Sequence, residues 1–153
     1  MEYGSIEREI QIDASPELVY EVITKPEHIA RWWGFDASFS AAPGADGRLT
    51  RRRRDGHGSV VVPVLVVEAD APRRFVFRWG QSEGQPATPQ NSLLVTFELA
   101  PANGGTLLRL TEAGFREIGW EAAQIEAHYR DHSAGWDEYL PGLAAYAAGL
   151  LRA

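Results

Sequence analysis

Two residues of this sequence have side chains suited to acid–base chemistry in apolar surroundings, Glu112 and His132. Glu112 shares a period-two face with Leu108 and Leu110, and His132 lies on an apolar helical stripe. A carboxylate or an imidazole acts as a general acid or base when a pocket holds it and shifts its pKa. No other feature supports catalysis, so both residues are weak catalytic candidates and also candidate polar contacts for a ligand.

A run of four arginines, Arg51 to Arg54, is the most unusual charged feature. If Leu49 faces inward, strand alternation turns Arg51 and Arg53 inward as well. An inward arginine pairs with a carboxylate, for which Glu112 is the obvious internal partner, or it anchors an acidic ligand headgroup. The alternative, which we favour, is a solvated strand end, because arginine is rarely buried without a partner.

Metal binding and nucleophilic catalysis find little support. His128 and His132 are four residues apart on the predicted last helix, but a zinc site needs further ligands that the sequence does not specify. There is no cysteine, no Gly-x-Ser-x-Gly motif and no Gly-x-x-x-x-Gly-Lys loop. We therefore expect no metal, no cofactor, and no serine or cysteine nucleophile.

Composition restricts the partners and the cellular location. Fifteen Lys and Arg against 21 Asp and Glu give a formal net charge of -6, which argues against a general nucleic-acid binder. No apolar stretch is long enough for membrane insertion, and the first residues do not form a secretory signal. Together with the absence of cysteine, these features predict a cytoplasmic protein with a small-molecule partner.

Large aromatic side chains are candidates for the wall of a ligand cavity, because such cavities are concave and mostly apolar. The alternative is that the same rings fill the space and form an ordinary core. The predicted ligand-binding residues are Trp33, Arg51, Phe77, Trp79, Phe97, Leu110, Glu112, His132, Trp136 and Leu140.

The elements that position these residues begin with a strand over residues 6–12, where isoleucines alternate with polar residues. Ser15, followed by proline, is a predicted N-cap that opens a helix ending near Thr24. Capping-box spacing around Pro26 predicts a second short helix that ends near Trp33.

Short apolar runs separated by turn signals follow, and they predict an antiparallel meander because the connections are short. The predicted strands lie near residues 35–40, 47–54, 59–69, 73–79, 91–99 and 105–113.

From residue 125 onward the apolar spacing changes to three or four residues, which predicts one long helix packed on the sheet. Pro141 is expected to kink it, because proline lacks a backbone N–H. Alanines at positions 144, 145, 147 and 148 allow close packing against a second subunit, so a homodimer is possible. Alanine is also the best helix former, which is sufficient reason for its presence.

Five segments carry a resemblance to a known family. They are DASPELVY at 13–20, RWWG at 31–34, PRRFVFRW at 72–79, LTEAGF at 110–115 and GWDEYL at 135–140. With the order of elements, they resemble the START-like or Bet v 1-like (SRPBCC) superfamily, in its heat-shock-protein ATPase activator homologue-like branch.

The resemblance covers nearly the whole chain and implies an α+β helix-grip fold. In that fold a strongly curved antiparallel sheet of about seven strands surrounds a long C-terminal helix, and two short helices follow the first strand. We expect residues 1–153 to form a single START-like domain with an internal cavity. Members of the family often carry a histidine where this chain has Glu112.

The function expected on these grounds is binding of a small hydrophobic or amphipathic molecule. Its apolar part is expected against the aromatic residues of the predicted set, and its polar end near Arg51 or Glu112. One alternative is an enzyme of the cyclase or hydrolase kind that uses Glu112 or His132 as acid or base. Another is a protein-interaction module in the manner of the chaperone-activating relatives.

Overall fold

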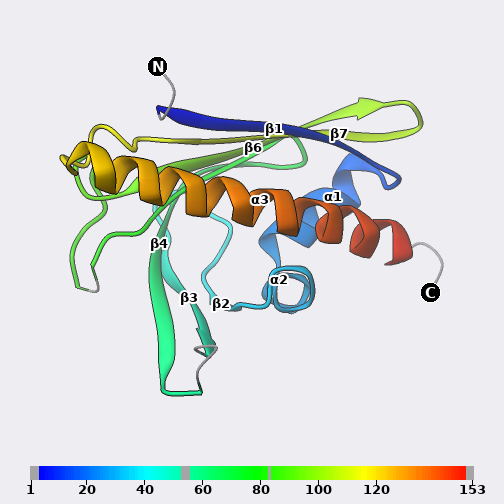
Figure 1. The fold of residues 1–153 in the computed structure, drawn as a ribbon. Coiled ribbons are helices and arrows are strands. Elements are labelled where there is room, and N and C mark those ends of the chain that lie inside the picture. Colours follow the sequence, from blue (N-terminus) through cyan, green and yellow to red (C-terminus); the bar gives the residue numbers. More distant parts are fainter. Residues whose placement is uncertain (1–3, 53–55, 83, 151–153) are drawn as a thin grey trace.

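The computed structural model describes residues 4–52, 56–82 and 84–150 (Figure 1). These residues form ten elements. In chain order they are β1 (Ser5–Ile12), α1 (Pro16–Thr24), α2 (Pro26–Trp32), β2 (Asp36–Ser38), β3 (Asp46–Arg52), β4 (Ser59–Asp70), β5 (Arg74–Trp79), β6 (Leu93–Ala102), β7 (Gly105–Ala113) and α3 (Ala122–Leu150).

All seven strands belong to one antiparallel sheet with the order β1-β7-β6-β5-β4-β3-β2. The sheet curves strongly, so that the β3–β4 hairpin bends away from β1, β7 and β6 while α3 crosses the inner face (Figure 1). A register shift between Val66 and Glu68 interrupts the β4–β5 ladder, and such bulges bend a strand and increase its twist. The arrangement confirms the predicted helix-grip α+β fold.

The two short helices connect the first strand to the second, as predicted. The Ser15 hydroxyl accepts a 3.2 Å hydrogen bond from the Leu18 N–H, so it caps α1. The predicted capping box around Pro26 is wrong, because the N-cap residue Lys25 makes no side-chain cap. Thr24 instead donates its hydroxyl to the Tyr20 carbonyl at 2.7 Å and closes the end of α1.

The junction of α2 with the sheet places an aromatic side chain. The indole N–H of Trp32 donates to the Val22 carbonyl at 2.8 Å, which joins α2 to α1. Trp33 follows as the C-cap of α2 and stacks on Trp32, with ring centroids 5.0 Å apart. Gly34 then takes a positive φ of 79°, which glycine adopts without strain, and redirects the chain toward β2.

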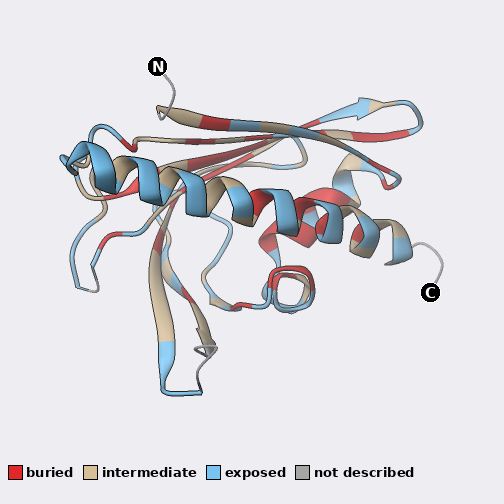
Figure 2. Cartoon of the chain, viewed as in Figure 1, coloured by how far each residue is buried: buried red, intermediate tan, exposed pale blue. Residues whose placement is uncertain are grey.

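The helix α3 buries the face predicted from its spacing. Its outer side is exposed along most of its length, and its inner side is intermediate in the first half of the helix and buried from Trp136 onward (Figure 2). The fully buried positions are Trp136, Leu140, Leu143 and Ala147. The helix runs through Pro141 without interruption. No helix in the described part of the chain combines the length and the apolarity needed to cross a membrane.

Candidate functional site

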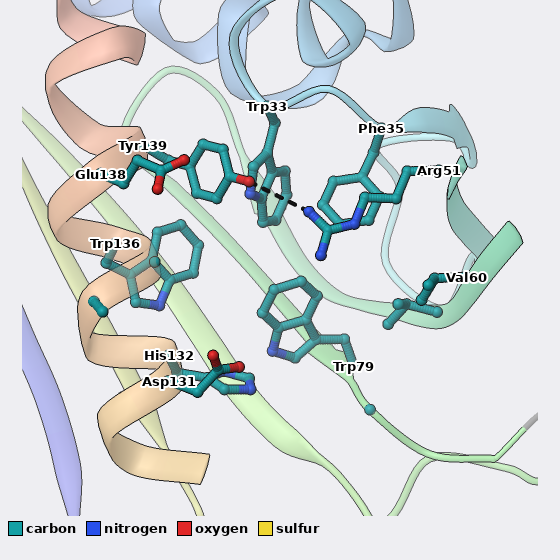
Figure 3. A pocket seen from close by; sticks show the side chains of 14 residues that line it. Trp33, Phe35, Arg51, Val60, Trp79, Asp131, His132, Trp136, Glu138 and Tyr139 are labelled. Carbon is teal, nitrogen blue, oxygen red and sulfur yellow. Dashed lines mark hydrogen bonds between the residues drawn. The ribbon is translucent and has the colours of Figure 1, made fainter. Parts of the chain in front are cut away.

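A pocket of about 450 Å³ lies between α3, the end of α2 and strands β3 to β5 (Figure 3). Its walls come from segments far apart in the chain, which the curvature of the sheet brings together. The lining residues are Trp33, Phe35, Arg51, Val60, Val62, Trp79, Gly80, Asp131, His132, Ala134, Gly135, Trp136, Glu138 and Tyr139.

Trp33 is the centre of the aromatic wall. Its ring centroid lies 5.3 Å from that of Trp79, 5.5 Å from that of Trp136 and 5.2 Å from that of Phe35. These separations lie within the range of favourable aromatic contacts, so the rings support one another. The wall is therefore a preformed apolar surface, contributed by α2, α3 and the sheet.

Arg51 is the cationic group of the wall (Figure 3). It follows Leu49 on the inner face of β3, as strand alternation predicts, and Leu49 is buried. The guanidinium carbon lies 5.0 Å from the ring centroid of Phe35, a cation–π contact, and Nη1 donates to the Tyr139 hydroxyl at 3.3 Å. Among the described residues, no carboxylate forms an ion pair with Arg51.

The predicted pairing of Arg51 with Glu112 is wrong. Glu112 lies on β7 and Arg51 on β3, and β6, β5 and β4 separate these strands in the sheet. The favoured alternative of a solvated strand end is also wrong for Arg51, which is half-buried in the pocket wall. The expectations for Arg53 and Arg54 fall outside the described residues.

Glu112 is fully buried behind the pocket, at 0% exposure. Its neighbours across the sheet are Ile6 on β1 and Val95 on β6, both buried. A carboxylate in such apolar surroundings must be hydrogen-bonded, because burial of an uncompensated charge is very unfavourable. Its hydrogen-bond donors must therefore come from side chains other than these two cross-strand neighbours.

Three N–H groups supply those partners. The indole of Trp79 donates to Oε2 at 2.7 Å, and the indole of Trp136 donates to Oε1 at 2.8 Å. Nδ1 of His132 lies 3.0 Å from Oε1 and 2.9 Å from Oε2. An ionised carboxylate only accepts hydrogen bonds, so with Glu112 as the carboxylate Nδ1 carries the hydrogen of this contact. Two of the pocket's tryptophans are thus fixed through one buried carboxylate.

His132 connects this buried group to the pocket. Its ring packs edge-on against Trp79 and Phe115, at 5.8 Å from each centroid, and its side chain is 24% exposed. Burial lowers the pKa of the imidazole, but the hydrogen bond and charge of Glu112 and the charge of Asp131 outweigh it. The pKa of His132 is consequently raised above its ordinary value of 6.5.

Two exposed carboxylates, Asp131 and Glu138, stand at the rim of the pocket (Figure 3). Neither was predicted from the sequence, and nor were Tyr139 and Phe35. The helical spacing contains a signal for the carboxylates, because Asp131 and Glu138 are seven residues apart and flank the stripe that holds His132. The rim is therefore acidic, whereas the wall carries a cation.

The structure divides the predicted ligand-binding residues into two groups. Those that line the pocket are Trp33, Arg51, Trp79, His132 and Trp136. Those that lie in the buried core instead of on the wall are Phe77, Phe97, Leu110, Glu112 and Leu140. The second group includes side chains that hold the first in place, and the assignment of ligand contacts stays a prediction.

The two histidines that are four residues apart on the last helix, His128 and His132, have different contacts, and His128 packs against an aromatic ring. The ring of His128 stacks on Trp120, with centroids 4.0 Å apart, whereas His132 bonds Glu112. Within the described ranges, no group of three histidine, aspartate or glutamate side chains is arranged to hold a metal ion.

Comparison with known proteins gives one family and many similar folds. The family model described as Activator of Hsp90 ATPase homolog 1-like protein matches residues 13–148. No curated protein matches the chain.

Three solved structures illustrate the likeness of fold. Protein MLL2253 from Mesorhizobium loti is 24% identical with a TM-score of 0.70, over 93% of this chain and 95% of that one. A protein of unknown function from Staphylococcus aureus is 14% identical with a TM-score of 0.76, over 97% and 96%. The Aha1 dimer from Colwellia psychrerythraea is 22% identical with a TM-score of 0.67, over 92% of each chain.

Proposed function

This chain belongs to the Activator of Hsp90 ATPase homolog 1-like protein family, and we propose that it binds a small amphipathic molecule in the pocket between α3 and β3. The observation that carries the proposal is an aromatic wall that includes an arginine without an ion-pair partner among the described residues. Such a pocket offers an apolar surface and one fixed charge.

The aromatic wall supports the apolar part of the ligand. Trp33, Trp79 and Trp136 present ring surfaces at the pocket, and a planar group between them removes apolar area from water. Burial of apolar surface contributes about 25 cal/mol per Å², so a ring system bound here gains most of its affinity from this contact.

Arg51 supports a polar group on the ligand. A guanidinium has donors in a planar fork, and the contact with the Tyr139 hydroxyl occupies only one side of that fork. A carboxylate is the group that a guanidinium binds best, since two parallel N–H···O bonds form at once. We therefore propose that the ligand carries an acidic group that reaches Arg51.

A glycine in the pocket wall provides the decisive variant. A Cβ built on Gly135 meets no atom within 4 Å, and Gly135 lines the pocket. Gly135→Leu therefore adds side-chain atoms to the pocket wall from a Cβ that meets no atom, and leucine favours the helix over glycine. Gly142→Leu is the matched control, because Gly142 lies on the same helix, has the same free space and is not in the pocket wall.

The experiment is isothermal titration calorimetry with 1-naphthoate, 2-naphthol and decanoate. Wild-type protein and Gly142→Leu are expected to bind at least one probe, and Gly135→Leu is expected to bind none. If no probe binds wild-type protein, or if Gly135→Leu binds as well as the control, the pocket is not the ligand site.

A homodimer is a separate proposal. It is supported by the Colwellia psychrerythraea protein, which is described as a dimer. Of the alanines considered for such contact, Ala147 is buried inside this chain and Ala145 is exposed. Light scattering during size-exclusion chromatography is expected to give twice the mass of 16.9 kDa; the monomer mass at every concentration rejects the dimer.

The cytoplasmic location also stays a proposal, and it rests on the absence of cysteine from the sequence.

A further inference from the structure

We infer that the pocket takes an aromatic hydroxyl compound and holds it as its phenolate, with the imidazolium of His132 as the counter-ion. This inference rests on the proposed function, since it names the ligand class of the same pocket. His132 touches the ligand, and Glu112 acts through His132 as a positioning residue.

The first step is the fixed orientation of the imidazole. Nδ1 of His132 is bound to the Glu112 carboxylate, so the opposite edge of the ring, which carries Nε2, is the one left to contact a ligand in the pocket that His132 lines. Nε2 has no hydrogen-bond partner among residues 4–52, 56–82 and 84–150. In the neutral ring with hydrogen on Nδ1, Nε2 is a proton acceptor.

The second step is the environment that stabilises the protonated ring. Glu112 is fully buried, and its other two donors are indole N–H groups, which do not titrate in the physiological range. Glu112 therefore keeps these two hydrogen bonds whichever charge the imidazole carries. A proton arriving at Nε2 completes an ion pair with Glu112 at 2.9 Å.

The other charged groups of the pocket act on the imidazolium and on the bound anion with opposite signs. On α3, the exposed carboxylate of Asp131 is next to His132 and its charge favours the imidazolium, whereas Glu138 lies further along the rim, beside Tyr139 (Figure 3). From β3, Arg51 brings a positive charge that has no ion-pair partner among the described residues. A phenolate at Nε2 of His132 thus meets the imidazolium, and Arg51, on the β3 side of the pocket, adds a second positive charge to the wall.

The third step is the choice of a phenol over other acids. A carboxylic acid is already ionised at neutral pH, so it gains nothing from the proton-accepting Nε2 of His132. A phenol has an ordinary pKa of about 10, as in tyrosine, so it becomes a phenolate at neutral pH only where a base takes its proton and the resulting cation stays beside it. Its ring also suits the wall of Trp33, Trp79 and Trp136.

The proton balance is simple. When the imidazole is neutral, the O–H bond of the ligand breaks, the proton forms an N–H bond at Nε2, and the electron pair stays on the phenolate oxygen. When the imidazole is already protonated, the phenol releases its proton to water on binding. Both routes end in the same imidazolium–phenolate pair, and no other reactant is needed.

The test uses 4-nitrophenol, whose phenolate absorbs visible light whereas the phenol does not. Its methyl ether, 4-nitroanisole, has the same ring and nitro group but no proton to lose. We expect wild-type protein to bind both compounds. We expect bound 4-nitrophenol to have a lower apparent pKa than in free solution, so that it is half-ionised at a proton concentration about tenfold higher. The readouts are the absorbance titration for ionisation and calorimetry for binding of either probe.

Three variants assign the effect. His132→Phe keeps an aromatic ring but cannot hold a proton, so bound 4-nitrophenol is expected to lose the tenfold shift while 4-nitroanisole binds as before. Glu112→Gln is expected to reduce the shift, provided circular dichroism shows a folded protein. His128→Phe is the control, because His128 lies one turn away, stacked on Trp120 outside the pocket, and the shift is expected to persist.

The outcomes separate this inference from the proposed function. If 4-nitroanisole or 1-naphthoate binds but bound 4-nitrophenol ionises as it does in solution, the phenolate inference is overturned and the binding proposal stands. An equal shift in His132→Phe overturns the role of His132. If neither nitro compound binds, and 1-naphthoate, 2-naphthol and decanoate do not bind either, both proposals are overturned.

Discussion

The indole of Trp136 on α3 donates a 2.8 Å hydrogen bond to the buried carboxylate of Glu112 on β7. This bond joins the long helix to the inner face of the sheet at a position whose neighbours along the sheet, Ile6 and Val95, are apolar. The same carboxylate holds Trp79 and His132. One buried charge therefore sets the positions of three side chains in the pocket wall.

Loss of this charge is expected to destabilise the fold strongly. Glu112→Ala leaves two indole N–H groups and the imidazole without their acceptor, and removal of one partner from a buried charged network costs about 3 kcal/mol. Urea denaturation followed by circular dichroism measures this loss of unfolding free energy.

An exposed ion pair between β1 and α3 provides the control for that experiment. Arg8 and Asp137 are joined at 2.7 Å, with side chains 30% and 61% exposed. Asp137→Asn is expected to cost less than about 1 kcal/mol, because solvent screens such pairs. Equal losses in Glu112→Ala and Asp137→Asn contradict the assignment of Glu112 as the central structural charge.

The stability of the protein is expected to fall as the pH rises through the folded-state pKa of His132. The pKa is raised in the folded protein, so below 6.5 the imidazole is protonated both in the folded and in the unfolded chain and its stabilising contribution is complete. Above 6.5 the unfolded chain loses the proton first, and the contribution declines until the folded imidazole has lost it too.

Urea denaturation across this pH range checks the sign. His132→Gln is expected to remove most of the decline, and His128→Gln is expected to retain it. Stability that rises with pH in wild-type protein but not in His132→Gln contradicts a raised pKa for His132.

Replacement of Arg51 is expected to change ligand affinity and not stability. Arg51→Met keeps a long apolar stem but removes the guanidinium, so affinity for 1-naphthoate is expected to fall by about tenfold or more, since a hydrogen bond to a charged group contributes roughly 1.5–3 kcal/mol. Affinity for the uncharged 4-nitroanisole is expected to change little.

Calorimetry with both ligands separates the two effects, and Arg73→Met serves as the control because Arg73 is exposed and lies outside the pocket wall. If Arg51→Met loses affinity equally for 1-naphthoate and 4-nitroanisole, Arg51 contributes to packing of the pocket wall and does not bind the anion.

Two glycines are expected to respond in opposite directions to alanine. A Cβ on Gly105, at the start of β7, would overlap the carbonyl oxygen of Ile12, so Gly105→Ala forces the backbone to move. Gly142 in α3 has free space and a helical setting, so Gly142→Ala is expected to stabilise the protein by about 0.5–1 kcal/mol. Thermal denaturation of both variants checks the signs, and stabilisation by Gly105→Ala would contradict a close approach of β1 to the start of β7.

Much of the fold could be predicted because its signals are local. The alternating isoleucines of β1, the Ser15 cap and the helical stripe through Trp136 each depend on residues close together in the chain. Turn signals placed most strand boundaries within a few residues, since glycine and proline act on their own backbone.

The partners of the charged side chains could not be predicted from the sequence. Arg51 and Glu112 both face the inner side of the sheet, as alternation predicts, and the predicted meander already sets three strands between theirs. Spacing does not specify how the sheet curves across that gap. The curvature of the sheet then brings Arg51 to Tyr139 and leaves Glu112 to two tryptophans. These contacts depend on the whole fold, and neither residue spacing nor composition specifies them.

The most direct test of a ligand pocket at this place uses the indole N–H signals of the five tryptophans as reporters. The protein is labelled with ¹⁵N and titrated with 1-naphthoate, and the five resonances are assigned by substitution. Trp33, Trp79 and Trp136 line the pocket, so their signals are expected to shift with a common affinity, whereas the signal of Trp120, stacked on His128, stays in place. Shifts at Trp120 without shifts at the three pocket tryptophans, or no shift at any of them, contradict a ligand site between α3 and β3.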